Sequence, residues 1–207
     1  MQHVNVDKQE VFTDYVWSFM MPDHDYWKKE IENIVLIEKN KSLHNFSTEN
    51  LEDKPVQAHK TAWDSHYRYP AIMNILKIIS SAIQQSIKQD GWEAPDLKPL
   101  EAWINWYEKN QFAYSHIHHC LLSAVYYVKS ANSPSEFFFH RDDRFRLRKE
   151  KEDSNTKLVK PKEGTVIFFT GCQYHSVSAN TSDVTRITLA TNFQGVYPQN
   201  WDPYATK

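Results

Sequence analysis

Apolar side chains recur at helical spacing in the first half of the chain. After Pro70 they form a stripe up to Gly91 that consists of Ile72, Ile75, Leu76, Ile79, Ile83 and Ile87. Steps of three and four residues place this stripe on one face of a helix, and proline is favoured at the first helical position. A similar stripe predicts a helix over residues 26–38. We expect both helices to pack on a core, with a polar loop over residues 40–69.

From Leu97 onward the pattern changes to short runs of β-branched and aromatic residues. Seven runs predict strands at 102–107, 114–119, 121–129, 136–140, 165–170, 174–179 and 186–193. Turns and charged segments separate them, which indicates an antiparallel sandwich or barrel. The charged stretch 141–163 is either a solvated connection or a lid over a site. We therefore expect one mainly β domain over 1–207, with helical support and loops over 1–96 and a β core over 97–207.

Composition excludes several classes of function. The 207 residues carry 24 basic and 26 acidic side chains, a net charge of −2, which gives no electrostatic reason to expect a nucleic acid or an anionic membrane as partner. The four glycines are too far apart for a dinucleotide-binding or P-loop motif. Two cysteines, an N-terminus without an apolar signal segment and the lack of a membrane span favour a reducing cytoplasm. The pattern carries no signal of oligomeric state.

The first candidate functional residues lie in the segment 114–120, Tyr-Ser-His-Ile-His-His-Cys. In a strand, His116 and His118 project to one side and His119 to the other, because side chains alternate. Two imidazoles on one strand face form half of a metal site. The alternative is that both rings are simply hydrogen-bonded. We interpret His119 as a structural histidine and His140 as a hydrogen-bonded surface or edge residue.

A second candidate group follows a glycine-bounded apolar strand at 164–171. His175 begins the next strand, and Arg186 and Thr188 share one face of the last one. A guanidinium beside a hydroxyl suits a bidentate contact with a carboxylate. The alternative interpretation is that Arg186 is an exposed residue on an edge strand.

These elements resemble the Fe(II)/2-oxoglutarate-dependent oxygenase superfamily. The pattern is a His-x-acid motif, an aromatic strand, G-x-x-x-x-F, a distal histidine and Arg-x-Ser/Thr. In this sequence the five elements lie, in the same order, at residues 116–118, 123–128, 164–169, 175 and 186–188. The run Val-Tyr-Tyr-Val at 125–128 is similar to prolyl-hydroxylase-type members, and Trp-Ile-Asn at 103–105 to a largely uncharacterised branch. The resemblance covers about residues 97–193 and implies a double-stranded β-helix, or jelly roll, of cupin type.

The resemblance also implies a role for individual residues. His116 and His175 would bind Fe(II), while Arg186, with Thr188 and Tyr127, would hold the distal carboxylate of 2-oxoglutarate; Asn105 would line the same pocket. One position departs from the pattern, because His118 stands where the family has a carboxylate. We favour ligation by His118. A carboxylate from Asp142, Asp143 or Asp64, or a site without iron chemistry, are the alternatives.

The resulting hypothesis is an Fe(II)- and 2-oxoglutarate-dependent dioxygenase that hydroxylates a small molecule or a peptide and releases succinate and CO2. Two other functions compete with it. One is a jelly-roll module with a structural metal or none. A structural zinc site would use Cys120 and Cys172 with one histidine, either His118 or His175. The other is a three-His cupin-type dioxygenase that does not use 2-oxoglutarate. Neither needs Arg186.

Overall fold

The computed structural model describes residues 5–11, 14–42, 56–92, 95–130, 136–140 and 156–197. Two long helices, α1 (His24–Ser42) and α3 (Pro70–Gln89), confirm the two predicted from apolar stripes. A short helix, α2 (Ser65–Arg68), lies in the segment that we expected to be loop. No helix among these residues combines the length and the apolar character needed to cross a membrane.

The strands form two sheets. The larger sheet has the order β1-β2-β10-β7-β12-β5-β4, and its strands are β1 (Val6–Val11), β2 (Asp14–Met20), β4 (His59–Lys60), β5 (Asp96–Tyr107), β7 (Leu122–Lys129), β10 (Thr165–Thr170) and β12 (Arg186–Val196). The smaller sheet has the order β3-β6-β11-β8-β9, with β3 (Val56–Gln57), β6 (Phe112–His116), β8 (Phe137–His140), β9 (Thr156–Val159) and β11 (His175–Val177).

From β5 to β12 the chain passes repeatedly between the two sheets. Strands β5, β7, β10 and β12 lie in the larger sheet, whereas β6, β8, β9 and β11 lie in the smaller one. All named strand pairs are antiparallel. This alternation is that of a double-stranded β-helix, so the predicted fold is confirmed.

Several strands were not predicted. Strands β1 and β2 extend the larger sheet beyond β10, although we expected only helices and loops before residue 97. A signal exists in β2, where Tyr15, Trp17 and Phe19 alternate with other residues. Strand β9 lies in the charged stretch 141–163 and pairs with β8. Residues 141–155 fall outside the described residues, and the domain boundaries stay a prediction.

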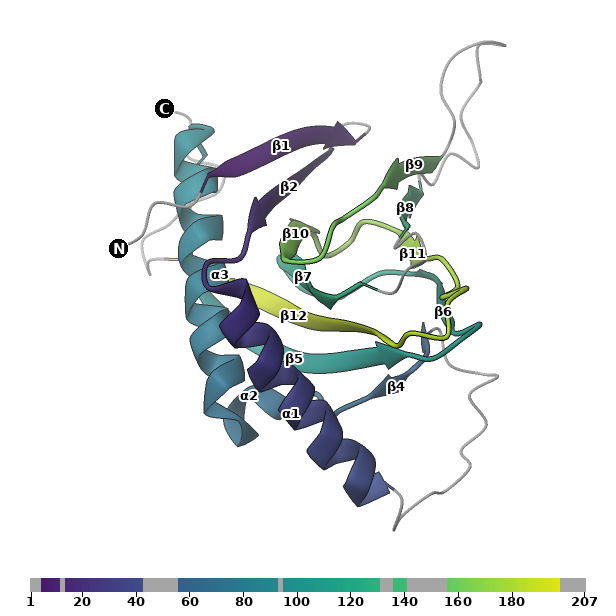
Figure 1. Ribbon diagram of the computed structural model, residues 1–207. Helices are drawn as coiled ribbons and strands as arrows, with labels where there is room; N and C mark the ends of the chain where they lie inside the picture. The colour runs from purple at the N-terminus through teal and green to yellow at the C-terminus, as the bar shows by residue number, and fades with distance from the viewer. Residues whose placement is uncertain are drawn as a thin grey trace, which may run out of the picture.

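Helices α1 and α3 cover the outer face of the larger sheet, and the smaller sheet faces its other side (Figure 1). The outer core joins apolar side chains of both helices, such as Ile31 and Ile75, to sheet residues that include Trp17, Phe168 and Leu189. A smaller inner cluster consists of Val16, Tyr127, Phe137, Phe139, Ile167 and Phe169. The helices thus bury one apolar face of the sheet, and the opposite face is free to line a site.

The outer core should depend strongly on α3. Ile75 is fully buried in it, so Ile75→Ala should lower the free energy of unfolding by about 2–5 kcal/mol through lost burial and a cavity. Urea unfolding measures this difference. Ser81→Ala changes an exposed position of the same helix and should leave the stability nearly unchanged. Equal effects of the two substitutions would contradict this packing.

Candidate metal centre

Three histidines converge between the two sheets. In the register of β6 and β11, His116 stands opposite His175, and the ring centroids lie 4.3 Å apart. The ring of His118 lies 5.2 Å from that of His116 and 5.1 Å from that of His175. One nitrogen from each ring falls within 4.8 Å of the others. This is the one group of metal-ligating side chains of this kind that the described part of the chain contains.

His118 reaches the group in a different way from the one predicted. The strand that we expected to run to residue 119 ends at His116, so alternation along a strand does not place His118. Instead its backbone N–H donates to the carbonyl oxygen of Gly171 at 2.8 Å. That glycine lies so close to Cys120 that a Cβ atom would stand 2.4 Å from the carbonyl oxygen of Cys120. Close packing of these two loops therefore fixes His118.

Two of the rings are oriented by backbone carbonyl groups. The Nδ1 atom of His116 lies 2.7 Å from the carbonyl oxygen of Tyr114, and that of His175 lies 2.9 Å from the carbonyl oxygen of Gln173. A carbonyl oxygen only accepts, so Nδ1 carries the proton and donates it in both rings. Their Nε2 atoms then present lone pairs, which is how histidine binds a metal ion.

Burial keeps all three imidazoles neutral. It lowers the pKa of His116 and, more strongly, that of His175. Burial, with the neighbouring His116 and His119, lowers the pKa of His118 to about 4. Because a metal ion competes with protons for these nitrogens, neutral rings at physiological pH favour metal binding.

The expected carboxylate-binding residues surround the same space. Arg186, Thr188, Tyr127 and Asn105 are all buried. Thr188 stands opposite Asn105 on β5 and opposite Tyr127 on β7. A pocket of about 40 Å³ is lined by the last three residues and by the three histidines. The structure therefore brings six of the seven predicted residues to one pocket.

Arg186, the seventh, is fully buried in the inner layer. Its guanidinium carbon lies 4.3 Å from the ring centroid of Tyr107, which lines the pocket. Nη2 donates to the carbonyl oxygen of Ser178 at 2.9 Å. Nε and Nη1 have no hydrogen-bond partner among the described residues, and neither does Oδ1 of Asn105. Burial lowers the pKa of Arg186, but a guanidinium stays charged in proteins.

Such a group is costly to bury without a partner. A buried charge is stable only when it is paired or fully hydrogen-bonded. Two unsatisfied donor atoms beside a pocket therefore indicate a binding site for an anion. Nearby, burial raises the pKa of Tyr127 well above its usual range, so its hydroxyl keeps its proton.

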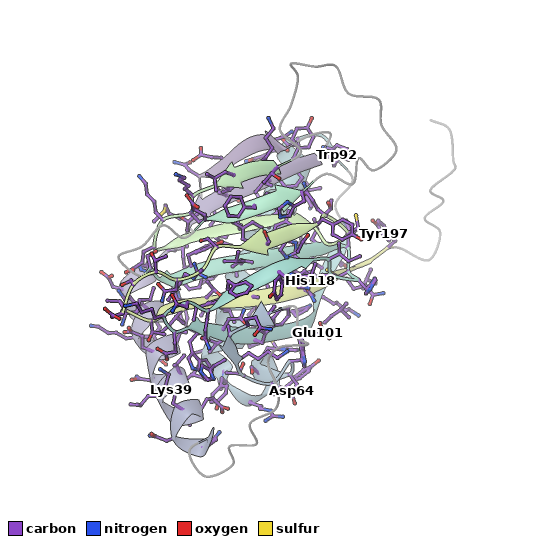
Figure 2. The ribbon with its side chains drawn as sticks, turned by 90° about the vertical axis from the view of Figure 1, so that its right-hand side faces the viewer. Lys39, Asp64, Trp92, Glu101, His118 and Tyr197 are labelled. Carbon is purple, nitrogen blue, oxygen red and sulfur yellow. The ribbon has the colours of Figure 1, made fainter. Side chains whose placement is uncertain are left out.

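Of the alternative carboxylate ligands, Asp64 does not belong to the histidine group. Asp64 is exposed and pairs with Arg68 at 3.0 Å, and Figure 2 shows it well below His118. Asp142 and Asp143 lie outside the described residues. Cys120 and Cys172 are free cysteines and do not join the metal-ligating group. Within the described chain, no carboxylate completes the set.

His119 and His140 do not belong to the metal-ligating group. His119 is exposed. The Nε2 atom of His140 lies 2.7 Å from the hydroxyl oxygen of Ser176. Trp103 and Tyr107 also line the pocket with Asn105, although we did not predict them as site residues. The strand periodicity of residues 103, 105 and 107 was the available signal.

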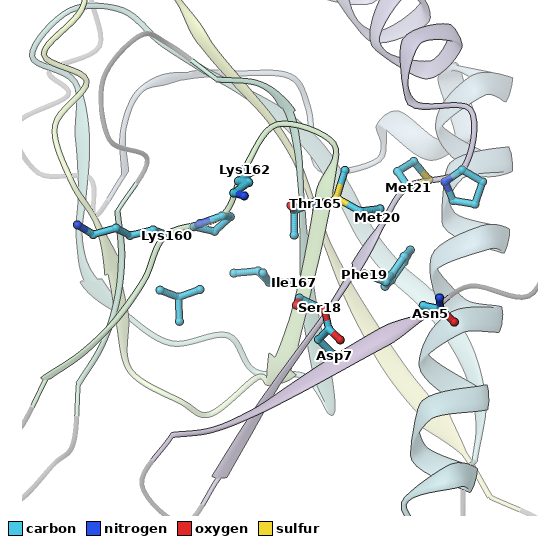
Figure 3. A pocket seen from close by; sticks show the side chains of 13 residues that line it. Asn5, Asp7, Ser18, Phe19, Met20, Met21, Lys160, Lys162, Thr165 and Ile167 are labelled. Carbon is cyan, nitrogen blue, oxygen red and sulfur yellow. Dashed lines mark hydrogen bonds between the residues drawn. The ribbon is translucent and has the colours of Figure 1, made fainter.

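A larger hollow lies elsewhere. It has a volume of about 860 Å³ and lies between β2, β10 and residues 159–162 (Figure 3). Its floor includes Phe19 and Ile167, and Lys160 and Lys162 stand at its side. None of the three histidines lines it. We therefore take the smaller pocket as the candidate site, because the three histidines line it and the unsatisfied donors of Arg186 lie beside it.

Comparisons with known proteins agree with this fold. The model of a family described as "Putative 2OG-Fe(II) oxygenase" matches residues 101–192. No curated protein matches the sequence. The resemblance to Fe(II)/2-oxoglutarate-dependent oxygenases, prolyl hydroxylases included, is confirmed.

Solved structures of low sequence identity share the fold. The alpha-ketoglutarate-dependent carbocyclase SnoK from nogalamycin biosynthesis has 14% identity and a TM-score of 0.61, with 86% of this chain and 80% of that chain covered. The epimerase SnoN, in complex with Fe3+, alpha-ketoglutarate and nogalamycin RO, has 11% identity and a TM-score of 0.56, covering 86% and 78%. A prolyl hydroxylase in complex with a hypoxia-inducible-factor peptide, from Trichoplax adhaerens, has 13% identity and a TM-score of 0.55, covering 82% and 79%.

Loss of one of the three rings should weaken metal binding. His175→Ala removes a nitrogen of the converging group, and it should lower Fe(II) affinity by at least about 10-fold, since even outer partners of a ligand contribute that much. Anaerobic calorimetric titration measures the affinity. His119→Ala, a neighbouring but exposed histidine, is the control and should bind as the native protein does. Native affinity in His175→Ala would exclude this centre.

The same titration tests His118. His118→Ala should weaken Fe(II) binding, whereas His118→Asp should retain it, because a carboxylate at this position restores the two-His-one-carboxylate set. If His118→Ala bound Fe(II) with unchanged affinity, His118 would not be a ligand.

Proposed function

We propose that the protein is an Fe(II)- and 2-oxoglutarate-dependent dioxygenase that hydroxylates a small-molecule or peptide substrate. The observation that carries this proposal is the buried Arg186 guanidinium, whose Nε and Nη1 atoms lack a partner among the described residues. A structural metal site does not need such a group. A three-His dioxygenase that works without a diacid does not need it either.

The residues present fit both the metal and the co-substrate. His116, His118 and His175 would hold Fe(II) through imidazole nitrogens, which suit that ion. Three ligands leave coordination positions for 2-oxoglutarate and oxygen. Arg186 would form charged hydrogen bonds with the distal carboxylate of 2-oxoglutarate, and Thr188, Tyr127 and Asn105 would add polar contacts around it.

The protein's contribution is orientation and the exclusion of water. Phe137 stacks on the ring of His175, with centroids 5.0 Å apart and the planes 12° apart, and Trp103 contacts His118 with centroids 5.8 Å apart. These aromatic rings restrict the orientation of the histidine rings, and they form an apolar part of the pocket wall. At about 40 Å³ the pocket has room for only a few water molecules.

Bound iron and 2-oxoglutarate would supply the oxidising chemistry, in which O2 gives one oxygen atom to the substrate as hydroxyl and one to succinate, with release of CO2. The proposed substrate class, a small molecule or a peptide, is consistent with the structural relatives, one of which holds a small molecule and one a peptide. We also propose a cytoplasmic location for the protein, as expected from the sequence.

Anaerobic titration of the Fe(II)-loaded protein with 2-oxoglutarate tests the proposal. Chelation of iron by the keto acid should produce a visible metal-to-ligand charge-transfer band. Arg186→Ala should weaken 2-oxoglutarate binding about 10- to 100-fold, the effect of losing charged hydrogen bonds, and should change Fe(II) affinity far less. Equal loss of both would contradict the role given to Arg186.

Two further variants control the result. Arg68→Ala removes an exposed arginine paired with Asp64 and should leave the band intact. Thr188→Val keeps the shape of a pocket side chain without its hydroxyl, and it should weaken 2-oxoglutarate binding even if Arg186→Ala fails to fold. Tight Fe(II) binding without any band would favour a three-His dioxygenase of another kind or a metal-binding module.

A further inference from the structure

Residues 56–63 pass from the smaller sheet to the larger one beside the pocket. Strand β3 pairs with β6 of the smaller sheet, and β4 pairs with β5 at the edge of the larger one (Figure 1). Val56 of β3 lines the pocket, and Lys60 of β4 stands opposite Asn105, another lining residue. Register partners on adjacent strands share one face of a sheet. Lys60 therefore lies on the face that carries the pocket.

Trp63 lies against the wall of the same pocket. Its ring centroid is 4.4 Å from that of Trp103, and the ring of Trp103, which lines the pocket, is 5.8 Å from that of His118. Trp63 is nevertheless 45% exposed. Two ring contacts therefore connect a solvent-exposed indole to a proposed metal ligand. A ligand that stacks on Trp63 has to extend past only one further indole to reach the histidine group.

The backbone around Trp63 is fixed although its ring is exposed. The carbonyl oxygen of Trp63 accepts from the N–H of Ala102 at 2.8 Å. Two residues earlier, the N–H of Thr61 donates to the carbonyl oxygen of Ile104 at 3.0 Å, and the hydroxyl oxygen of Thr61 accepts from the N–H of Ile104 at 3.0 Å. An aromatic side chain on such a fixed backbone loses little conformational freedom when a ligand binds. Tryptophan is also enriched among the residues that contribute most to binding.

The charge beside Trp63 restricts what can stack on it. Nζ of Lys60 lies 3.8 Å from the ring centroid of Trp63, so an ammonium group already makes the cation–π contact with this indole. The neighbouring Asp64 is paired with Arg68 at 3.0 Å. A second cation on the ring would be repelled by Lys60, whereas an aromatic ring would gain a stacked or edge-to-face contact. The surroundings of Trp63 therefore favour a neutral or anionic aromatic group.

We propose that Trp63 is a specificity-determining residue that binds an aromatic ring of the substrate beside the pocket. Trp103 and Lys60 position its indole. The substrate is then a molecule whose hydroxylated carbon lies close to a neutral or anionic aromatic group. This inference rests on the proposed function for the reaction, but the stacking itself requires neither iron nor 2-oxoglutarate.

Calorimetric titration of the full chain with N-benzylacetamide tests the stacking. This neutral probe has an aromatic ring and no carboxylate, so it does not compete for Arg186. Trp63→Ala should weaken its binding at least about 10-fold, the effect of losing a central aromatic contact, and Trp63→Phe should restore most of it because a ring remains. Trp92→Ala is the matched control. Trp92 is 59% exposed, and its N–H donates at 3.0 Å to the carbonyl oxygen of Ile87 in α3, on the outer side of the molecule, so this variant should bind the probe as the native protein does.

Three related probes define the ligand. N-(cyclohexylmethyl)acetamide has a similar size without an aromatic ring and should bind more weakly than N-benzylacetamide. Benzylammonium keeps the ring but is cationic, and it should also bind more weakly; Lys60→Gln should reduce this difference, which keeps the inference testable even if Trp63→Ala does not fold. N-acetylphenylalanine amide carries the ring on a peptide unit. If it binds through Trp63 more tightly than N-benzylacetamide, the ring belongs to a peptide, and if more weakly, to a small molecule.

A second measurement places the bound ring relative to the metal centre. Paramagnetic Co(II) bound to the three histidines should broaden the proton resonances of bound N-benzylacetamide, because Trp63 is two ring contacts from His118. Trp63→Ala should abolish this broadening at probe concentrations that saturate the native protein only.

Several results would overturn the inference. They are a failure of the native protein to bind N-benzylacetamide, native affinity in Trp63→Ala, an equal loss in Trp92→Ala, equal affinity for the cyclohexyl probe, and a bound probe that Co(II) does not broaden. Failure to bind Fe(II) or 2-oxoglutarate, with probe binding through Trp63 intact, would instead overturn the proposed function.

Discussion

The structure depends on the division of the larger sheet into two chemically different faces. Along β12, Ile187, Leu189 and Phe193 pack into the core beneath the helices, whereas Thr188 and Ala190 line the inner pocket. Because α1 and α3 bury the outer face, the inner face does not have to supply the main hydrophobic core. It can therefore carry amides, hydroxyls and a guanidinium where an ordinary sandwich would place aliphatic side chains.

Burial of Arg186 shows the cost of this arrangement. A fully buried guanidinium with unsatisfied nitrogen atoms destabilises a protein that has no ligand for it. Tyr107 below the guanidinium carbon and the carbonyl group of Ser178 compensate only part of this cost. An anion in the neighbouring pocket would satisfy the remainder. Stability and ligand binding are therefore linked, as for any ligand that binds only the folded state.

Like Arg186, the three histidines are polar groups that are removed from solvent and oriented by specific contacts. Desolvation keeps the rings neutral, and two of them are oriented by the carbonyl groups of the residues two positions earlier. His118 is held through the loop contact with Gly171 and faces Asn192. The Nδ2 atom of Asn192 also donates to Oε2 of Glu101.

The sequence alone determined the two long helices, the alternation of strands in the second half and the candidate residues. It did so because hydrophobic periodicity and residue chemistry are local properties. It did not reveal β9, whose charged surroundings hide a short strand, nor the reason why His118 joins His116. Tertiary structure decided these points: the register of β6 against β11 set His175 opposite His116, and the packing of Gly171 on Cys120 placed His118. Contacts between residues far apart in the chain, such as Glu101 with Asn192, follow from sheet pairing, which no single segment encodes.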